Sequence, residues 1–154
     1  MINKITSDII GAAIQVHRYL GPGLLESSYK TCLSAELRHL GLRVEREKAV
    51  RIRYRDVNLT CAFRIDLLVE RTVVVELKVA DKLAPVHVSQ VLTYLRFGGY
   101  QVGLLFNFNV DALAAGGIRR VVYGHNIPKP SDPSVSPELS ASSRFRTEVK
   151  EPRR

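Results

Sequence analysis

Apolar residues recur at helical spacing in three segments of the chain. Between residues 2 and 20 they fall every three or four positions until the sequence LGPG interrupts them, so a first helix should end there. A second stripe covers residues 24–40 and stops before Gly41, a residue type that often ends helices. A third begins at Pro85, which suits the first turn of a helix, and two consecutive glycines end it.

Between the second and third helices the spacing changes to the alternation typical of β-strands. Val44 and then residues 50–54 alternate with charged side chains, and the turn sequence RDVN leads into LTCAFRIDLLV. The sequence ERT connects that run to VVVELKV, and QVGLLFNF and IRRVVYG supply two strands after the third helix. The predicted order is helix, helix, three or four strands, helix, strand, strand, without an internal repeat.

The segment 128–154 differs in composition from the rest of the chain. It holds five of the seven prolines together with many serines. We expect one folded domain over residues 1–127, which is long enough to bury its own core, followed by a flexible tail rich in proline and serine.

The chain has 23 lysines and arginines against 15 acidic residues, a formal net charge of +8. The six basic and four acidic residues of the tail contribute +2 and leave +6 on the predicted domain. Such a balance favours a polyanionic partner such as nucleic acid, although plain solubility explains it equally well. The first segment lacks a secretory pattern, and no apolar run approaches the roughly 20 residues of a membrane span. We therefore expect a cytoplasmic protein with reduced thiols and no membrane partner.

Three charged residues lie within otherwise apolar strand sequences: Asp66 before ERT, and Glu76 and Lys78 after it. Because side chains alternate along a strand, Glu76 and Lys78 share one face. If residues 70–72 form the loop, the register places Asp66 directly opposite Glu76, with Cβ atoms about 4.5–5.5 Å apart. Opposed carboxylates repel each other, and a hard cation such as Mg²⁺ would offset that repulsion. A two-residue loop would instead separate the acids, and a lone E-x-K is usually a solvated ion pair.

Two helical motifs supply further polar groups. Glu26 falls in the first turn of the second helix, with Tyr29 on the same face. An acid at that position also simply complements the helix dipole. Gln90 and Tyr94 are spaced i, i+4 on the third helix, a pattern that a tyrosine at the core edge beside an exposed glutamine also produces.

Taken together, these motifs resemble the GxxExxY protein family of the PD-(D/E)xK nuclease superfamily over roughly residues 2–123. The resemblance rests on these residues in order: Gly23, Glu26 and Tyr29; Asp66; Glu76-x-Lys78; Gln90-x-x-x-Tyr94, within PVHVSQVLTYL; and then GLLFNFNV. It implies an α/β (α+β) fold with a restriction-endonuclease-like αβββαβ core, in which helices flank a central mixed sheet.

The resemblance also implies a role for each matched residue. Asp66 and Glu76 would hold Mg²⁺, for which Mn²⁺ can substitute, and Glu26 would add a direct or indirect contact to the metal. Lys78 would assist the attacking water or the developing charge.

Two further positions match the family pattern on helices. Gln90 and Tyr94 resemble an element of the exonuclease-like branch that helps to hold substrate near the metal. The family also has a histidine ahead of the glycines, matched by His17. A histidine on a helix is more often structural, and that alternative stays open.

The leading hypothesis is a Mg²⁺-dependent nuclease that hydrolyses phosphodiester bonds of nucleic acid, DNA in the first instance, with a metal-activated water. Basic residues between 43 and 55 and at 119–120 are candidates for backbone contacts, with a solvated strand face as their alternative. The first alternative is a catalytically weak nucleic-acid-binding or protein-interaction module on the same fold. A small-molecule metallohydrolase ranks third, because no Cys or His pair has zinc spacing. A homodimer or partner protein would improve the grip of so small a domain on its substrate.

Overall fold

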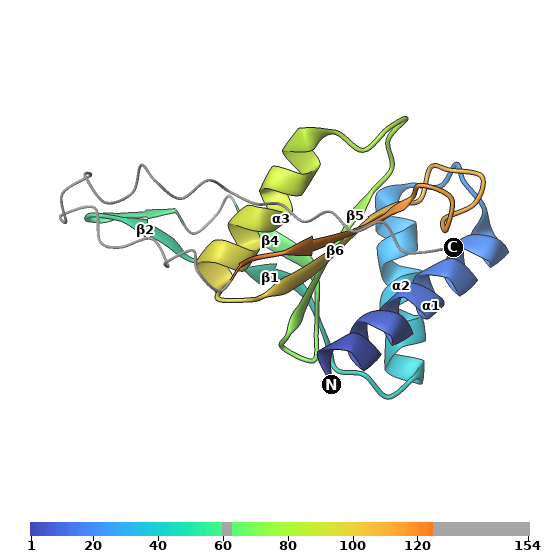
Figure 1. Ribbon diagram of the computed structural model, residues 1–154, viewed down its shortest axis with the longest axis horizontal. Coiled ribbons are helices and arrows are strands. Elements are labelled where there is room, and N and C mark those ends of the chain that lie inside the picture. Colours follow the sequence, from blue (N-terminus) through green and yellow to red (C-terminus); the bar gives the residue numbers. More distant parts are fainter. Residues whose placement is uncertain (60–62, 125–154) are drawn as a thin grey trace.

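The computed structural model describes residues 1–59 and 63–124, which contain three helices (Figure 1). These are α1 (Ile2–Leu20), α2 (Glu26–His39) and α3 (Pro85–Gly98). All three end where glycines were expected to stop them, and Gly99 takes the left-handed conformation at the end of α3, with φ 77°. The predicted tail, residues 128–154, and the domain boundary at residue 127 lie outside the described residues.

Within the described residues, seven strands accompany the helices. They are β1 (Val44–Ala49), β2 (Ile52–Tyr54), β3 (Val57–Leu59), β4 (Arg64–Val69), β5 (Val73–Lys78), β6 (Val102–Asn107) and β7 (Ile118–Val122). Five of them separate α2 from α3, so the prediction of three or four was wrong. The run LTCAFRIDLLV, expected as one strand, contributes to both β3 and β4. The run is divided because its first part belongs to a separate, mostly exposed hairpin. β2 and β3 pair with each other, and this hairpin extends away from the main sheet, whereas β4 lies within it (Figure 1).

The main sheet has the strand order β1-β4-β5-β6-β7. β5 and β6 run parallel, whereas the other neighbours are antiparallel, so the sheet is mixed. The parallel pair is joined through α3, as a parallel connection requires a crossover. The elements α2, β1, β4, β5, α3 and β6 form the expected αβββαβ core, and the predicted fold class is confirmed.

Helices cover both faces of the sheet, with α1 and α2 on one side and α3 on the other (Figure 1). Leu67 and Val75 pack with the first two helices, whereas Leu68 and Val74 pack with α3. β4 and β5 are therefore buried on both faces, as their apolar sequences predict. A charged side chain within them must find a partner or remain at high energetic cost.

No helix within residues 1–59 and 63–124 combines the length and the apolar character that a membrane crossing needs.

Candidate active site

The β4–β5 hairpin has the predicted three-residue loop. The ladder pairs Val69 with Val73 and runs to Leu67 and Val75, and residues 70–72 form the turn. The next pair in the same register would be Asp66 and Glu76, and the observed ladder does not include it. The regular pairing stops just before these acids, so the two strands carry them at the end of their shared ladder.

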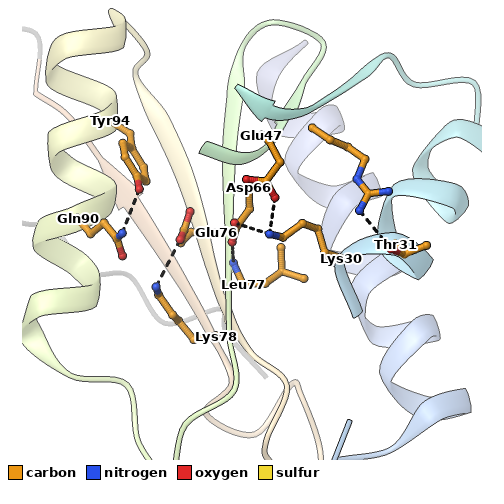
Figure 2. Close-up of polar contacts among 10 residues, drawn as sticks. Lys30, Thr31, Glu47, Asp66, Glu76, Leu77, Lys78, Gln90 and Tyr94 are labelled. Carbon is orange, nitrogen blue, oxygen red and sulfur yellow. Dashed lines mark hydrogen bonds and ion pairs between the residues drawn. The ribbon is translucent and has the colours of Figure 1, made fainter. Parts of the chain in front are cut away.

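Both carboxylate oxygens of Asp66 have partners, although its side chain is almost completely buried. The backbone N–H of Leu77 donates to Oδ2 at 2.9 Å, and Lys30 Nζ lies 2.9 Å from Oδ1 (Figure 2). The first contact locks the carboxylate to the neighbouring strand. The second brings a positive charge from α2, which compensates for the loss of water around the buried acid.

Glu76 is buried with only one oxygen partnered. Its Oε1 lies 3.4 Å from Lys78 Nζ, whereas Oε2 has no hydrogen-bond partner among the described residues (Figure 2). Burial, together with the negative charge of Asp66, raises the pKa of Glu76 to about 8. A buried acceptor without a partner is uncommon and marks a place where a cation or donor would be stabilised.

Glu26 is the first residue of α2 and lies within the electrostatic reach of Asp66 and Lys78. Burial raises its pKa, and the charge of Asp66 raises it further, while Lys78 acts in the opposite direction. Tyr29 points elsewhere, because its hydroxyl donates to the carbonyl of Gly21 and so anchors the glycine loop ahead of α2. The two residues of this motif therefore have different positions: Glu26 lies near the buried acids, whereas Tyr29 fixes the loop that precedes the helix.

Gln90 and Tyr94 lie on α3, on the side of that helix turned toward Glu76 and Lys78 (Figure 2). Gln90 Nε2 donates to the Tyr94 hydroxyl at 3.0 Å. Burial, and next to it the charge of Glu76, raises the pKa of Tyr94 to about 12, so the hydroxyl keeps its proton at neutral pH. Gln90 and Tyr94 therefore lie beside the Glu76 carboxylate, and their role in catalysis stays a prediction.

His17 has a structural role, the alternative that the sequence left open for it. The ring is buried, and Nε2 lies 3.0 Å from the carbonyl oxygen of Phe108, so the N–H is the donor. This bond links α1 to the segment that follows β6, across 91 positions of sequence.

Two residues of this region were missed by the sequence reasoning. Lys30 Nζ lies 2.6 Å from Glu47 Oε1 as well as beside Asp66 (Figure 2). The signal for Lys30 was its i, i+4 spacing from Glu26, which places both on one face of α2. Glu47 carried no such signal, because its position depends on the pairing of β1 with β4.

In the part of the chain that the structure describes, no three His, Cys, Asp or Glu side chains are arranged as a ready metal site. The ammonium groups of Lys30 and Lys78 instead approach one oxygen each of Asp66 and Glu76. The chemistry of the donors still fits a hard divalent cation, since they are carboxylate oxygens and one of them is buried without a partner.

Several of the basic candidates for nucleic-acid contact have side-chain partners within the protein. Arg43 is tied to Glu70, with Nη2 3.2 Å from Oε2, Arg46 donates to Thr31, Lys48 lies 3.6 Å from Glu45, and Arg120 bonds to side chains of α1. Arg51, Arg53 and Arg55 are exposed and lie on and just before the β2–β3 hairpin.

The fold and the paired acids are those of a nuclease-like α/β domain. A family model of the PD-(D/E)XK nuclease superfamily matches residues 3–121, and the chain belongs to that superfamily. The superfamily resemblance drawn from the sequence is thereby confirmed, and its nucleases typically use divalent metal ions and act on nucleic acid. Neither the curated proteins nor the solved structures contain a match to this chain.

Proposed function

We propose that the protein is a nuclease that hydrolyses phosphodiester bonds of DNA with Mg²⁺, for which Mn²⁺ can substitute. The observation that carries the proposal is the meeting of Asp66, Glu76 and Lys78 at one end of the β4–β5 ladder, with Glu76 Oε2 buried and unpartnered among the described residues. Folding alone does not favour such a cluster, because well-packed apolar residues in place of buried ions are often neutral or stabilising.

A bound Mg²⁺ would stabilise charge on the phosphate and make a water molecule acidic enough to attack near neutral pH. Asp66 and Glu76 would hold the ion, with Glu26 as an additional contact. The Leu77 N–H keeps the Asp66 carboxylate in one orientation. Lys78 offers a compact positive charge that can contact the attacking water or a phosphate oxygen.

Substrate would be held from two directions. On one side, Gln90 and Tyr94 offer an amide and a protonated hydroxyl next to Glu76. On the other, the β2–β3 hairpin follows β1 in the chain and extends away from the main sheet (Figure 1). At about 3.3 Å per strand residue, Tyr54 near its tip lies up to about 23 Å from Glu47. The exposed arginines of the hairpin would then contact phosphates several nucleotides from the cleaved bond.

One observation favours a second candidate, a binding module with little or no turnover. Lys30 is paired with one oxygen of Asp66, which a metal would otherwise use freely. If this pair prevents the metal from binding, the fold would bind nucleic acid without cutting it.

The deciding experiment incubates the protein with RNA and with linear and circular, single- and double-stranded DNA, in Mg²⁺, Mn²⁺ or EDTA. Lys78→Ala is the test variant, and Lys4→Ala is its matched control because Lys4 is an exposed lysine paired with Asp8 at 2.8 Å. We expect metal-dependent cleavage of DNA that falls at least about 100-fold in Lys78→Ala. The control should cleave like the wild type.

Absence of cleavage on every substrate, with nucleic-acid binding unchanged by metal and by the Lys78 substitution, would establish the binding module instead. If the protein cleaves RNA and no DNA substrate, the proposed substrate is RNA rather than DNA.

A further inference from the structure

Lys30 lies between two carboxylates from different strands. Its Nζ is 2.9 Å from Asp66 Oδ1 on β4 and 2.6 Å from Glu47 Oε1 on β1 (Figure 2). Only 13% of the lysine side chain and 9% of the Asp66 side chain are exposed, so that contact is largely shielded from water, whereas 46% of the Glu47 side chain is exposed. The proposed catalytic roles use neither Lys30 nor Glu47.

The backbone is unusual at the same point. Glu47 has φ 52° in the middle of β1, a conformation that residues other than glycine seldom adopt. The ladder pairs Arg46 with Leu67 and Lys48 with Ile65, so Glu47 lies across from Asp66. Such a conformation persists only where the surroundings hold it, and it occurs where the Glu47 carboxylate meets Lys30.

The acidic side chains around Lys30 outnumber the basic ones. Four carboxylates and two ammonium groups interact there, namely Glu26, Glu47, Asp66 and Glu76 with Lys30 and Lys78. When a divalent cation is bound and all six groups are ionised, their side chains carry −2, which that one cation neutralises. A second divalent cation would reverse the sign of the cluster and place two like charges beside the Lys30 ammonium.

We propose that the Lys30 ammonium holds the place of a second cation, so that the site takes one divalent ion, on the Asp66 and Glu76 side, rather than two. This inference rests on the proposed function. Two-metal sites hold their ions about 3.5–4 Å apart and need a carboxylate that both ions share. Asp66 is the acid placed for sharing, and its Oδ1 already has the ammonium that Glu47 anchors from the far side.

Lys30 is a positioning residue in this scheme. It keeps Asp66 in place while leaving the Glu76 side open, and Glu47 keeps the ammonium from being expelled when a metal arrives. The pair would thereby set the number of ions bound, a property that a purely structural ion pair would not affect.

The test counts Mn²⁺ ions bound to the full chain by calorimetry, with electron paramagnetic resonance to detect coupling between two bound ions. The variants are Lys30→Ala, Lys30→Met and Lys30→Arg, with Lys4→Ala as the control for loss of an ion-paired lysine. We expect one ion in the wild type, in Lys30→Arg and in the control. Lys30→Ala and Lys30→Met should bind a second ion that is spin-coupled to the first.

The added Glu47→Gln substitution supplies an internal check. The second ion gained by Lys30→Met should be lost again in the Lys30→Met/Glu47→Gln double variant, because the second site would then lack its outer carboxylate. Circular dichroism melts establish that each variant is folded, and the methionine variant retains the length of the side chain if alanine unfolds the protein.

Two coupled ions in the wild type would overturn the inference, as would one ion of unchanged affinity in both neutral variants of Lys30. These outcomes leave the nuclease proposal intact. Conversely, one ion in the wild type and two in Lys30→Met, with no cleavage of any nucleic acid, would remove the nuclease proposal and support the inference. If no variant binds Mn²⁺, both fail.

Discussion

Replacing Glu76 with glutamine should make the metal-free protein more stable at alkaline pH. Burial, and after it the charge of Asp66, raises the pKa of Glu76 from 4.5 to about 8. Between these values the native state binds a proton that the unfolded state has released. Native stability therefore falls as the pH rises through this window, and Glu76→Gln removes that dependence.

The size of the effect follows from the same two pKa values. Each pKa unit is worth about 1.4 kcal/mol, so a change from 4.5 to about 8 corresponds to about 5 kcal/mol when ionisation is complete. The glutamine amide enters a buried position where Oε2 has no partner, which costs about 1–3 kcal/mol. We expect a net gain of about 2–4 kcal/mol in the free energy of unfolding at pH 9, and no gain at pH 4.

Urea denaturation of the wild type and Glu76→Gln in EDTA, at pH 4, 7 and 9, measures this difference. Glu45→Gln is the matched control, because it removes a glutamate from the more exposed strand β1. Mn²⁺ added at pH 9 should stabilise the wild type and leave Glu76→Gln nearly unchanged, since the ion would neutralise the carboxylate that the variant lacks. A difference between wild type and variant that is the same at all three pH values would refute the reasoning.

Two other substitutions separate substrate contact from structure. Arg53→Ala and Arg55→Ala should each weaken binding to nucleic acid of any sequence and reduce the slope of log K against log salt by about 1, measured by fluorescence anisotropy; an unchanged slope would remove the hairpin from the binding surface. His17→Ala should lower the free energy of unfolding by about 2–3 kcal/mol in urea, because the Phe108 carbonyl loses its partner and the ring leaves a cavity. Its cleavage per folded molecule should match the wild type, and a loss of turnover without a loss of stability would contradict the structural role.

The hairpin that carries the site could be predicted because its determinants are close in sequence. Alternating side chains assign Glu76 and Lys78 to one face, and ten positions separate Asp66 from Glu76. The loop at residues 70–72 then sets the register, and the observed ladder follows it. The predicted number of strands was wrong at β3 and β4, because the spacing of apolar residues does not distinguish an exposed hairpin strand from the start of a buried strand.

The partners of the acids could not be predicted in the same way. Lys30 reaches Asp66 across 36 positions, and Glu47 reaches Lys30 only because β1 pairs with β4 while α2 lies nearby. The spacing of Glu26 and Lys30 indicates a shared helix face, but it does not say what that face meets.

The sequence by itself therefore determined the helices, most of the strands, the acidic hairpin and the superfamily, because all of these depend on local periodicity and on motifs in order. Only the tertiary structure decided which charges neutralise the buried acids, and it assigned His17 to the Phe108 carbonyl and Tyr29 to the glycine loop. Those contacts arise from the packing of α1 and α2 on the sheet. Burial then makes each pairing necessary, since an ion or donor removed from water must find a partner.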